Sequence, residues 1–441
     1  MGSRSRWELP LLWRNMGRSH SKVVPVSRND EDTGSKTVCK VGSWSTAATK
    51  DTPRAITKDT LTGTSKDTSR TASKDSSWMA SDRIFCDTPN SLAMQQGHTD
   101  QLTSLELNQC MEDLGFGVTK WPVGGFAFVR PLQEAPRSEG RVDEMHMLMA
   151  APGVQEAAPQ SVAVKTVKRS WMRSAPDRFA EMYPDENERP WFDVAIVSEL
   201  RKRSFPYVCD LHGIFSDDRS MYIVTSLATE GDLFSWSFRL PKPGVEREAR
   251  IQPIAAQVCV GMQWLHNLGV AHRDISVENI LLTRSRSGHL QVKLIDFGMA
   301  IVSQKSSGSQ WGKASYKAPE MHILRTYDAF LADAFSVGVV LYALAAMQYP
   351  WKKTIPDRDH HFSHAKKHGI RSFLSFMKVS LGCDEPRAAA DLFSGELMQV
   401  LEGLLQTDPA ARLTLGEACY GEQEHSSALT LPWLSRAMSP R

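Results

Sequence analysis

The sequence predicts an α+β protein in which a small, mostly β unit is followed by a larger helical unit. Between 116 and 227, apolar residues repeatedly alternate with polar or bulky ones, which is the pattern of half-buried strands. Beyond Asp232, apolar residues instead recur at the i, i+3, i+4 spacing of helices over 250–268 and 393–405, and the apolar run at 331–347 predicts a buried helix. This change of period marks the boundary between the two units.

The first 104 residues precede both units and differ in composition. Four copies of a (Thr/Ser)-Lys-Asp-(Thr/Ser) sequence begin at positions 49, 57, 65 and 73, with a strict eight-residue period. Nothing in this repeat can bury an apolar face, which predicts a disordered tail over 1–104 rather than a folded solenoid. Each copy places hydroxyl groups beside both signs of charge, so a phosphorylatable tether is the alternative interpretation.

Composition excludes several classes of protein. Lys and Arg number 52 and Asp and Glu number 50. This near balance of charge gives no reason to expect nucleic acid as a partner. The seven cysteines are widely spaced and include no CxxC pair, which favours reduced thiols in an intracellular, cytoplasmic protein. The longest apolar run, 334–347, is shorter than the roughly 20 residues that cross a bilayer, so no transmembrane segment is predicted. Pro10 argues against a helical targeting segment in the basic N-terminal 28 residues.

The elements of the β unit can be assigned in order along the chain. Strands are favoured where β-branched and aromatic residues alternate around Pro or Gly turns, and a helix where apolar residues recur with helical spacing. The sequence predicts strands within 116–129, a strand at 161–167, a helix at 193–203 and strands at 206–215 and 220–227, with inserts at 132–158 and 172–191. The domains are then a β-rich domain at 105–225, a connector at 226–231, a helical domain at 232–435 and a C-terminal tail at 436–441.

Three short motifs in the helical domain carry chemistry. HRDISVENILL occupies 272–282, LIDFG occupies 294–298, and APE follows at 318–320. Any one such tripeptide arises by chance and usually marks a turn, whereas all of them in this order form a specific pattern. The first two motifs carry three oxygen-bearing side chains: Asp274 on a loop, Asn279 at a strand end and Asp296 on a turn. These three side chains can converge on a metal-bound triphosphate.

These motifs resemble the catalytic loop, the magnesium-binding turn and the end of the activation segment of eukaryotic protein kinases. The resemblance covers about 110–435 and implies a two-lobed protein kinase fold, with a small β-rich N-lobe that has one helix and a larger helical C-lobe. It implies ATP and Mg²⁺ as cofactors and protein substrates as partners. The implied reaction is transfer of the γ-phosphoryl group of Mg-ATP to Ser or Thr hydroxyls, which needs positioning and charge neutralisation more than covalent chemistry.

Four residues match the catalytic positions of this family. Asp274 matches the aspartate that accepts a hydrogen bond from the substrate hydroxyl, while Asn279 and Asp296 match the two magnesium ligands. Carboxylate and amide oxygens suit Mg²⁺, a hard cation that keeps part of its water shell and bridges phosphates. Lys165, in the AVK of a predicted strand, matches the lysine that holds the α- and β-phosphates.

The acidic partner of this lysine can be assigned in two ways. The segment DVAIVSELR at 193–201 resembles the EVxxMSxLR helix of many kinases, which places Asp193 at the acid position. Glu199 is the alternative if the helix is rotated. Because an aspartate reaches about one methylene less far than a glutamate, the first assignment requires the helix to lie closer to Lys165.

The resemblance also suggests a nucleotide site. Residues 122–129 read PVGGFAFV, which resembles an eroded form of the glycine-rich GxGxxGxV loop, and glycines there would let backbone N–H groups approach phosphate. Ala163 would leave space for adenine, Thr225 falls at the gatekeeper position, and Asp232 fits the acid that meets ribose. The residues expected to bind ATP beside Lys165 are Val123, Gly124, Gly125, Val129, Ala163, Thr225, Ser226, Ala228, Asp232 and Leu281.

Phosphorylation of the activation segment is a further expectation. Arg273 precedes the catalytic aspartate, and such an arginine can pair with a phosphate that an upstream kinase adds to this segment. Ser309 lies thirteen residues after Asp296 and has the best spacing for that phosphate. The other candidates in the same segment are Ser303, Ser306 and Ser307.

Structural positions and two departures complete the pattern. Asp333 is expected to brace the catalytic loop, and Glu320 and Arg412 are expected to form a buried ion pair. Ser276 stands where Ser/Thr kinases usually have lysine, and Lys313 stands where they usually have threonine. We interpret this as an exchange: the hydroxyl group is now on Ser276 and the ammonium group on Lys313, on two loops that should face each other across Asp274. In the alternative interpretation, Lys313 points to solvent.

Two other functions compete with a Ser/Thr protein kinase. The eroded glycine loop and the uncertain helix acid would also suit a pseudokinase that binds partners allosterically. A small-molecule kinase of similar fold is disfavoured by APE and the activation segment, which serve peptide docking. The AAR or RAA catalytic loop of tyrosine kinases is not present in the sequence, so Ser/Thr specificity is favoured.

Overall fold

The computed structural model describes most of the chain beyond residue 100. The described ranges are 101–135, 140–148, 159–172, 189–355, 357–382, 384–421 and 425–438. The (Thr/Ser)-Lys-Asp-(Thr/Ser) repeat and the basic N-terminal segment lie outside the described residues, as does most of the predicted insert at 172–191. Leu102 is already buried, so the folded part begins slightly before the predicted boundary at residue 105.

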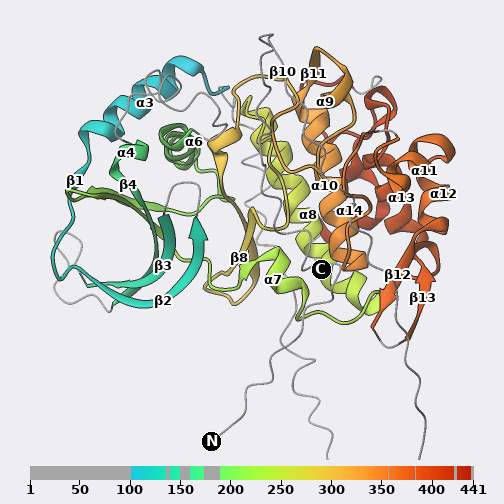
Figure 1. The fold of residues 1–441 in the computed structure, drawn as a ribbon, viewed down its shortest axis with the longest axis horizontal. Helices are drawn as coiled ribbons and strands as arrows, with labels where there is room; N and C mark the ends of the chain where they lie inside the picture. Colours follow the sequence, from blue (N-terminus) through green and yellow to red (C-terminus); the bar gives the residue numbers. More distant parts are fainter. Residues whose placement is uncertain are drawn as a thin grey trace, which may run out of the picture. The chain divides into compact units, whose positions relative to one another are not determined.

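The β-rich unit is built on a six-stranded sheet with the strand order β1-β5-β6-β4-β3-β2. Neighbouring strands pair antiparallel, apart from the parallel pair of β1 and β5. The strands are β1(Thr119–Lys120), β2(Phe126–Ala135), β3(Gly140–Met147), β4(Gln160–Lys168), β5(Leu211–Ser216) and β6(Ser220–Ser226). The described helices of this unit are α3(Ser104–Phe116), α4(Arg169–Met172) and α6(Pro190–Lys202), which lie together beside the sheet (Figure 1).

The stretch 132–158 was expected to be an insert, and this expectation is wrong for the strands up to residue 147, while 149–158 lie outside the described residues. β2 continues to Ala135, and β3 pairs with β4 from Arg141 to Met147. The sequence of β3, GRVDEMHM, contains two acidic residues, which are depleted in strands and therefore hid this one. Asp143 is fully buried in the sheet, where it accepts a hydrogen bond from Arg141 at 2.6 Å.

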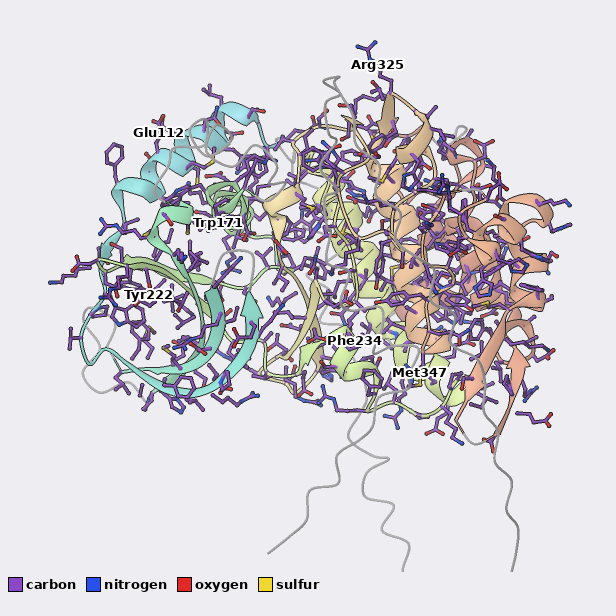
Figure 2. All side chains as sticks on the ribbon, in the orientation of Figure 1. Glu112, Trp171, Tyr222, Phe234, Arg325 and Met347 are labelled. Atoms are coloured by element: carbon purple, nitrogen blue, oxygen red, sulfur yellow. The ribbon has the colours of Figure 1, made fainter. Side chains whose placement is uncertain are left out.

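Two apolar clusters hold the sheet and its helices together. One contains Val162 and Val164 of β4, against which aromatic rings pack, with Trp121 and Tyr222 stacked 4.1 Å apart. The other contains Trp171 of α4 together with residues of α6, β5 and β6. Figure 2 labels Tyr222 and Trp171, which represent the two clusters. The second cluster fixes α6 against the sheet that carries Lys165.

The helical unit follows the connector after β6 and ends, in the described residues, with α14. Its helices are α7(Leu233–Ser237), α8(Val245–Asn267), α9(Glu320–Ile323), α10(Ala329–Ala346), α11(His360–His368), α12(Ile370–Phe376), α13(Gly395–Leu404) and α14(Pro432–Met438). Short strands form three further small sheets: β7(Gly231–Asp232) with β8(Ile280–Arg284) and β9(Leu290–Leu294), β10(Lys305–Ser307) with β11(Thr326–Asp328), and β12(Lys378–Leu381) with β13(Asp384–Ala388). A β-rich lobe followed by a helical lobe confirms the predicted α+β class (Figure 1).

α10 is the centre of the helical unit. Every residue of this helix is buried, and it packs against α8 and α13. Among the described residues it is also the one helix long and apolar enough to cross a membrane, with a mean hydropathy of 1.9, but all of that window is buried inside the protein. The apolar run in the sequence is thus a core helix, and its second turn carries Asp333.

Candidate functional site

One carboxylate holds the loop that carries Asp274. Asp333 accepts the backbone N–H groups of His272 at 2.7 Å and of Arg273 at 2.8 Å. Arg273 has a φ of 64°, in the left-handed region that residues other than glycine rarely adopt. The two hydrogen bonds offset the cost of this strained turn. Asp333 therefore lies where a brace of the loop was expected, and His266 of α8 contacts the same carboxylate at 3.1 Å.

Asp274 is buried at the end of this turn with one oxygen available. Its Oδ2 accepts a hydrogen bond from Nδ2 of Asn279 at 2.9 Å, and the same amide donates to the Asp274 carbonyl at 2.8 Å. The Oδ1 atom is buried without a hydrogen-bond partner, and a hydroxyl group of a substrate would satisfy it. Burial raises the pKa of Asp274 to about 7, although the positive charge of Lys313 opposes this shift.

The turn after β9 brings Asp296 beside the same loop. The backbone N–H of Ile295 donates to the carbonyl of Asn279 at 3.1 Å. Asp296, the next residue in the chain, therefore lies close to Asn279. Asp296 itself has φ 68° and ψ 65°, a second non-glycine residue in the left-handed region. Phe297 is buried beneath it, with its ring 4.8 Å from that of His272. The structure thus brings the three predicted oxygen-bearing side chains together.

Of the two candidate helix acids, Asp193 is the one that faces Lys165. Its Oδ2 lies 3.6 Å from Nζ of Lys165, and its Oδ1 accepts the backbone N–H of Phe297 at 2.8 Å. Burial raises the pKa of Asp193, and the Lys165 charge opposes this shift. Glu199 lies elsewhere on α6 and pairs with Arg203 at 2.5 Å. One carboxylate therefore links strand β4, helix α6 and the turn that carries Asp296.

The turn predicted to cover the phosphates, at 122–129, lies far from Lys165. Val123 is 96% exposed, and Gly124, with φ 75°, forms the turn before β2. The register of β2, β3 and β4 places this turn beside Gln160 at the start of β4. Gln160 and Lys165 are five residues apart, which is about 16 Å along a strand. The phosphate-loop roles assigned from the sequence were therefore wrong for Val123, Gly124, Gly125 and Val129.

The turn next to Lys165 is instead the connection between β2 and β3. Val142 pairs with Lys165, and the hairpin continues beyond this pair to the turn between Ala135 and Gly140. Residues 135–142 read APRSEGRV, which keeps the last glycine and the valine of the GxGxxGxV pattern. The middle of this turn lies outside the described residues. Strand pairing separates the two patterns: β3, which follows 135–140, pairs with the AVK strand β4, whereas β2, which follows 122–125, does not.

The remaining residues predicted to bind nucleotide lie at the junction of the two lobes. Ala163 on β4 pairs with Thr225 on β6, and Asp232 on β7 pairs with Leu281 on β8. The Asp232 carboxylate caps α7 by accepting the N–H of Ser235 at 2.7 Å. In chain order, the residues that the structure brings to this junction are Ala163, Thr225, Ser226, Ala228, Asp232 and Leu281.

Arg273 contacts neutral groups of the activation segment. Its Nη1 donates to Oγ of Ser306 at 3.1 Å, and its guanidinium lies 4.0 Å from the centre of the Trp311 ring. Ser309 had the best sequence spacing, and its backbone carbonyl accepts a hydrogen bond from Nζ of Lys317 at 2.6 Å. Ser306 is therefore the candidate serine that touches Arg273. Trp311 was not singled out by sequence reasoning, because nothing local marks it as a stacking partner.

Lys313 points inward. Its Nζ lies 2.5 Å from Oγ of Ser276 and 3.1 Å from Oε2 of Glu278, so the two exchanged residues contact each other. Burial raises and Lys313 lowers the pKa of Glu278, and the net shift is downward. The preceding Gly312 has φ 78°, and a Cβ atom there would lie 2.6 Å from the carbonyl oxygen of Arg273. Glycine is thus required at this close approach. Glu278 was not identified from the sequence.

The predicted structural ion pair also forms. Arg412 donates from Nη1 to Oε1 of Glu320 at 2.5 Å and from Nη2 to Oε2 at 2.9 Å. The two side chains are 0% and 2% exposed, so the pair is buried and bidentate. Loss of one partner would leave an uncompensated buried charge, at a cost of about 3–5 kcal/mol in such pairs.

The oxygen donors at this site fit Mg²⁺ held jointly with a nucleotide. In the described part of the chain, no group of three or more His, Cys, Asp or Glu residues could hold a metal ion by itself. Asp296 and Asn279 supply two oxygen-bearing side chains, and because Nδ2 of Asn279 donates to Asp274, its Oδ1 is left for coordination. Mg²⁺ usually takes one or two carboxylates and completes its shell with water and phosphate oxygens.

Comparison with known proteins gives a consistent result. The family model of the protein kinase domain matches residues 151–423. CBL-interacting protein kinase 4 of Oryza sativa subsp. japonica is 34% identical over 160 residues, which are 35% of this chain and 34% of that protein. Serine/threonine-protein kinase zyg-8 of Caenorhabditis elegans is 30% identical over 223 residues, 49% of this chain and 25% of that protein. Ribosomal protein S6 kinase alpha-1 of Homo sapiens is 29% identical over 232 residues, 52% of this chain and 28% of that protein. The chain therefore spans only about a quarter to a third of the length of these curated relatives.

Proposed function

Since this chain belongs to the protein kinase family, we propose that it is an active serine/threonine-protein kinase that uses Mg-ATP. The observation that carries this proposal is the position of Asp193, which contacts both Lys165 and the backbone of the Asp296 turn. Protein kinases need both this lysine–acid pair and the metal-binding aspartate in place for activity, and here one carboxylate fixes both. Relatives named as serine/threonine kinases support the same class of reaction.

The residues of the chain would divide the work by position. Lys165 would hold the α- and β-phosphates, fixed in place by Asp193 at 3.6 Å. Oδ1 of Asp274 would accept a hydrogen bond from the substrate hydroxyl and so orient its oxygen toward the γ-phosphorus. Asp296 and Asn279 would hold Mg²⁺, which when bound neutralises phosphate charge. The protein thus supplies positioning and electrostatic stabilisation.

Lys313 and Ser276 would complete the electrostatic environment. Their contact at 2.5 Å places an ammonium group on the loop that carries Asp274, although it originates from the activation segment. Its charge also acts on Asp274, whose pKa it lowers against burial. We infer that a positive charge still lies beside the phosphoryl group being transferred, but that it comes from Lys313 of the activation segment and not from position 276. The acceptors would be Ser or Thr hydroxyls of protein substrates, in an intracellular, cytoplasmic setting.

A pseudokinase is the second candidate, and one observation favours it. The turn beside Lys165 carries alanine and arginine at the first two glycine positions of the GxGxxGxV pattern, at 135 and 137. Backbone N–H groups approach phosphate most closely at glycine, so this turn should bind nucleotide less tightly than a glycine-rich one. A small-molecule kinase is the third candidate.

One experiment separates these three functions. The full chain is incubated with radiolabelled ATP and Mg²⁺, in one arm with a generic basic protein and in the other with a panel of small phosphate acceptors. We expect label in Ser and Thr of the protein and no label in the small molecules. Label in small molecules alone would indicate the third candidate, and no transfer to either acceptor would indicate a pseudokinase. The Asp274→Asn variant is the matched control for contaminating kinases.

A further inference from the structure

The helix α3 lies outside the residues matched by the kinase family model and packs against α6. Its apolar residues recur with helical spacing at Leu107, Cys110, Met111 and Leu114, and the first three are at most 6% exposed. They belong to the same buried cluster as Ala195, Ile196 and Leu200 of α6. Figure 1 shows α3 next to α6, and the side of α3 where Figure 2 labels Glu112 is turned away from α6.

Polar contacts fix the direction and register of α3 on α6. Sγ of Cys110 donates to the carbonyl of Ala195, in the middle of α6, at 3.8 Å. At the end of α6, Glu106 pairs with Arg203 at 2.7 Å, and Arg203 in turn pairs with Glu199. The two helices cross, since Figure 1 shows α6 nearly end-on while α3 lies in the plane of the view, and these contacts attach α3 to the middle and to the end of α6.

The start of α3 is also attached to the helical lobe. The backbone N–H of Leu102 donates to the carbonyl of Leu268, just after α8, at 2.8 Å. Thr103 caps the helix in a reciprocal capping box with Glu106, whose side chain also reaches Arg203. α3 is thus anchored on the helical lobe at one end and holds α6 along its side.

The other side of α6 carries the functional contacts. Asp193 reaches Lys165 at 3.6 Å and the Phe297 N–H at 2.8 Å. Since aspartate is one methylene shorter than glutamate, these contacts tolerate little outward movement of α6. The helix is held between the Asp296 turn on one side and α3 on the other.

We propose that α3 is a built-in positioning brace, which holds α6 where Asp193 can reach Lys165 and the Asp296 turn. This inference rests on the proposed kinase activity and adds a segment that acts through Asp193. Leu107 is its central positioning residue. The brace belongs to the same chain, so the active position of α6 needs no separate partner protein.

The test compares two identical changes on opposite sides of α3 in the full chain. Leu107→Asp places a charge in the packed interface, whereas Leu105→Asp, its matched control, changes a residue that is 78% exposed. We expect Leu107→Asp to lower kcat about 100-fold, the size of effect of displacing a reacting group by about 1 Å. Leu105→Asp should stay within about twofold of the unchanged chain. Leu107→Ala provides a milder version if the charged variant does not fold.

A double-mutant cycle separates positioning from general damage. If α3 acts through Asp193, Leu107→Asp should cost little further activity in a chain that already carries Asp193→Asn. Full additivity of the two losses would overturn the proposal. A second outcome would also overturn it: in Leu107→Asp, Cys110 becomes open to alkylation, which shows that α3 is detached, and yet kcat remains normal.

A readout independent of catalysis distinguishes this inference from the proposed function. The Phe297 amide is bonded to Asp193, so its hydrogen exchange should accelerate in Leu107→Asp and Leu107→Ala but not in Leu105→Asp. If the unchanged chain transfers no phosphate, the proposed function fails. The positioning role of α3 is then tested by the hydrogen exchange of the Phe297 amide alone. Equal exchange rates at Phe297 in all variants would reject the brace in either case.

Discussion

At the scale of single residues, the site depends on a few side chains in strained or buried positions. Arg273 and Asp296 both adopt positive φ, at 64° and 68°, and the hydrogen bonds around them offset the cost of those conformations. Such residues are specified by their chemistry and their neighbours in sequence. This explains why the residues of HRD and DFG could be singled out from the sequence, whereas Ser306 and Trp311, which meet Arg273 only through folding, could not.

The exchange of Ser276 and Lys313 gives the first prediction. Lys313→Ala removes the ammonium group that contacts Ser276 at 2.5 Å and should lower turnover by about one to three orders of magnitude, as for loss of a preorganised charge donor. Ser276→Lys combined with Lys313→Thr should restore much of that loss in a non-additive way. Steady-state kinetics on a peptide substrate measure both. Normal turnover in Lys313→Ala would show that the ammonium has no role in transfer.

The activation segment gives the second prediction. Ser306 is 4% exposed and contacts Arg273, so its hydroxyl helps order the segment without a phosphate. Phosphate on the predicted site, Ser309, or on Ser306 would pair with Arg273 only after the segment rearranges. We expect Ser306→Ala to lower activity more than Ser309→Ala in enzyme freed of phosphate by a phosphatase. Mass spectrometry of active enzyme is the companion measurement, and an absolute need for phosphate at 303–309 would contradict the expectation.

At the scale of elements, strand pairing decided what the sequence left uncertain. The pattern at 122–129 and the pattern at 135–142 each keep part of the glycine-rich motif. Only the second lies beside Lys165, because β3 pairs with β4 in a register that the sequence does not encode locally. α3 was likewise missed, although its capping box and apolar spacing were present in the sequence. α10, which is marked by a continuous apolar run, and α13, which is marked by an apolar period, were placed within a few residues.

The junction of α8, α10 and the C-terminal segment gives a prediction for pH. His266 lies between Asp333 and Glu417; burial alone would lower its pKa, but hydrogen bonds to both carboxylates raise it to about 9. Because this pKa lies above the usual 6.5, the charged ring stabilises the fold fully below about pH 6.5, and this contribution is lost as the pH rises through 9. Urea unfolding should therefore show a falling free energy of unfolding over this range, and a smaller fall in His266→Gln. An unchanged slope in the variant would exclude this role of His266.

At the scale of the whole molecule, the side chain of Asp193 connects the two lobes. This side chain contacts Lys165 in the β-rich lobe and Phe297 in the helical lobe, and α3 supports it from behind. The fold class and the domain order could be predicted because each lobe has its own apolar period. The contact between the lobes could not, since it joins Asp193 and Phe297, which are 104 positions apart.

The central claim is that Asp296 and its neighbours use Mg-ATP to phosphorylate protein. The most direct measurement is the turnover number of Asp296→Asn relative to the unchanged chain at saturating Mg-ATP, with thermal unfolding as the control for folding. An amide is a poor ligand for a hard cation, so we predict that the variant keeps its fold and loses turnover by at least two orders of magnitude. Turnover within about threefold of the unchanged chain would contradict the role of Asp296 and the account built on it.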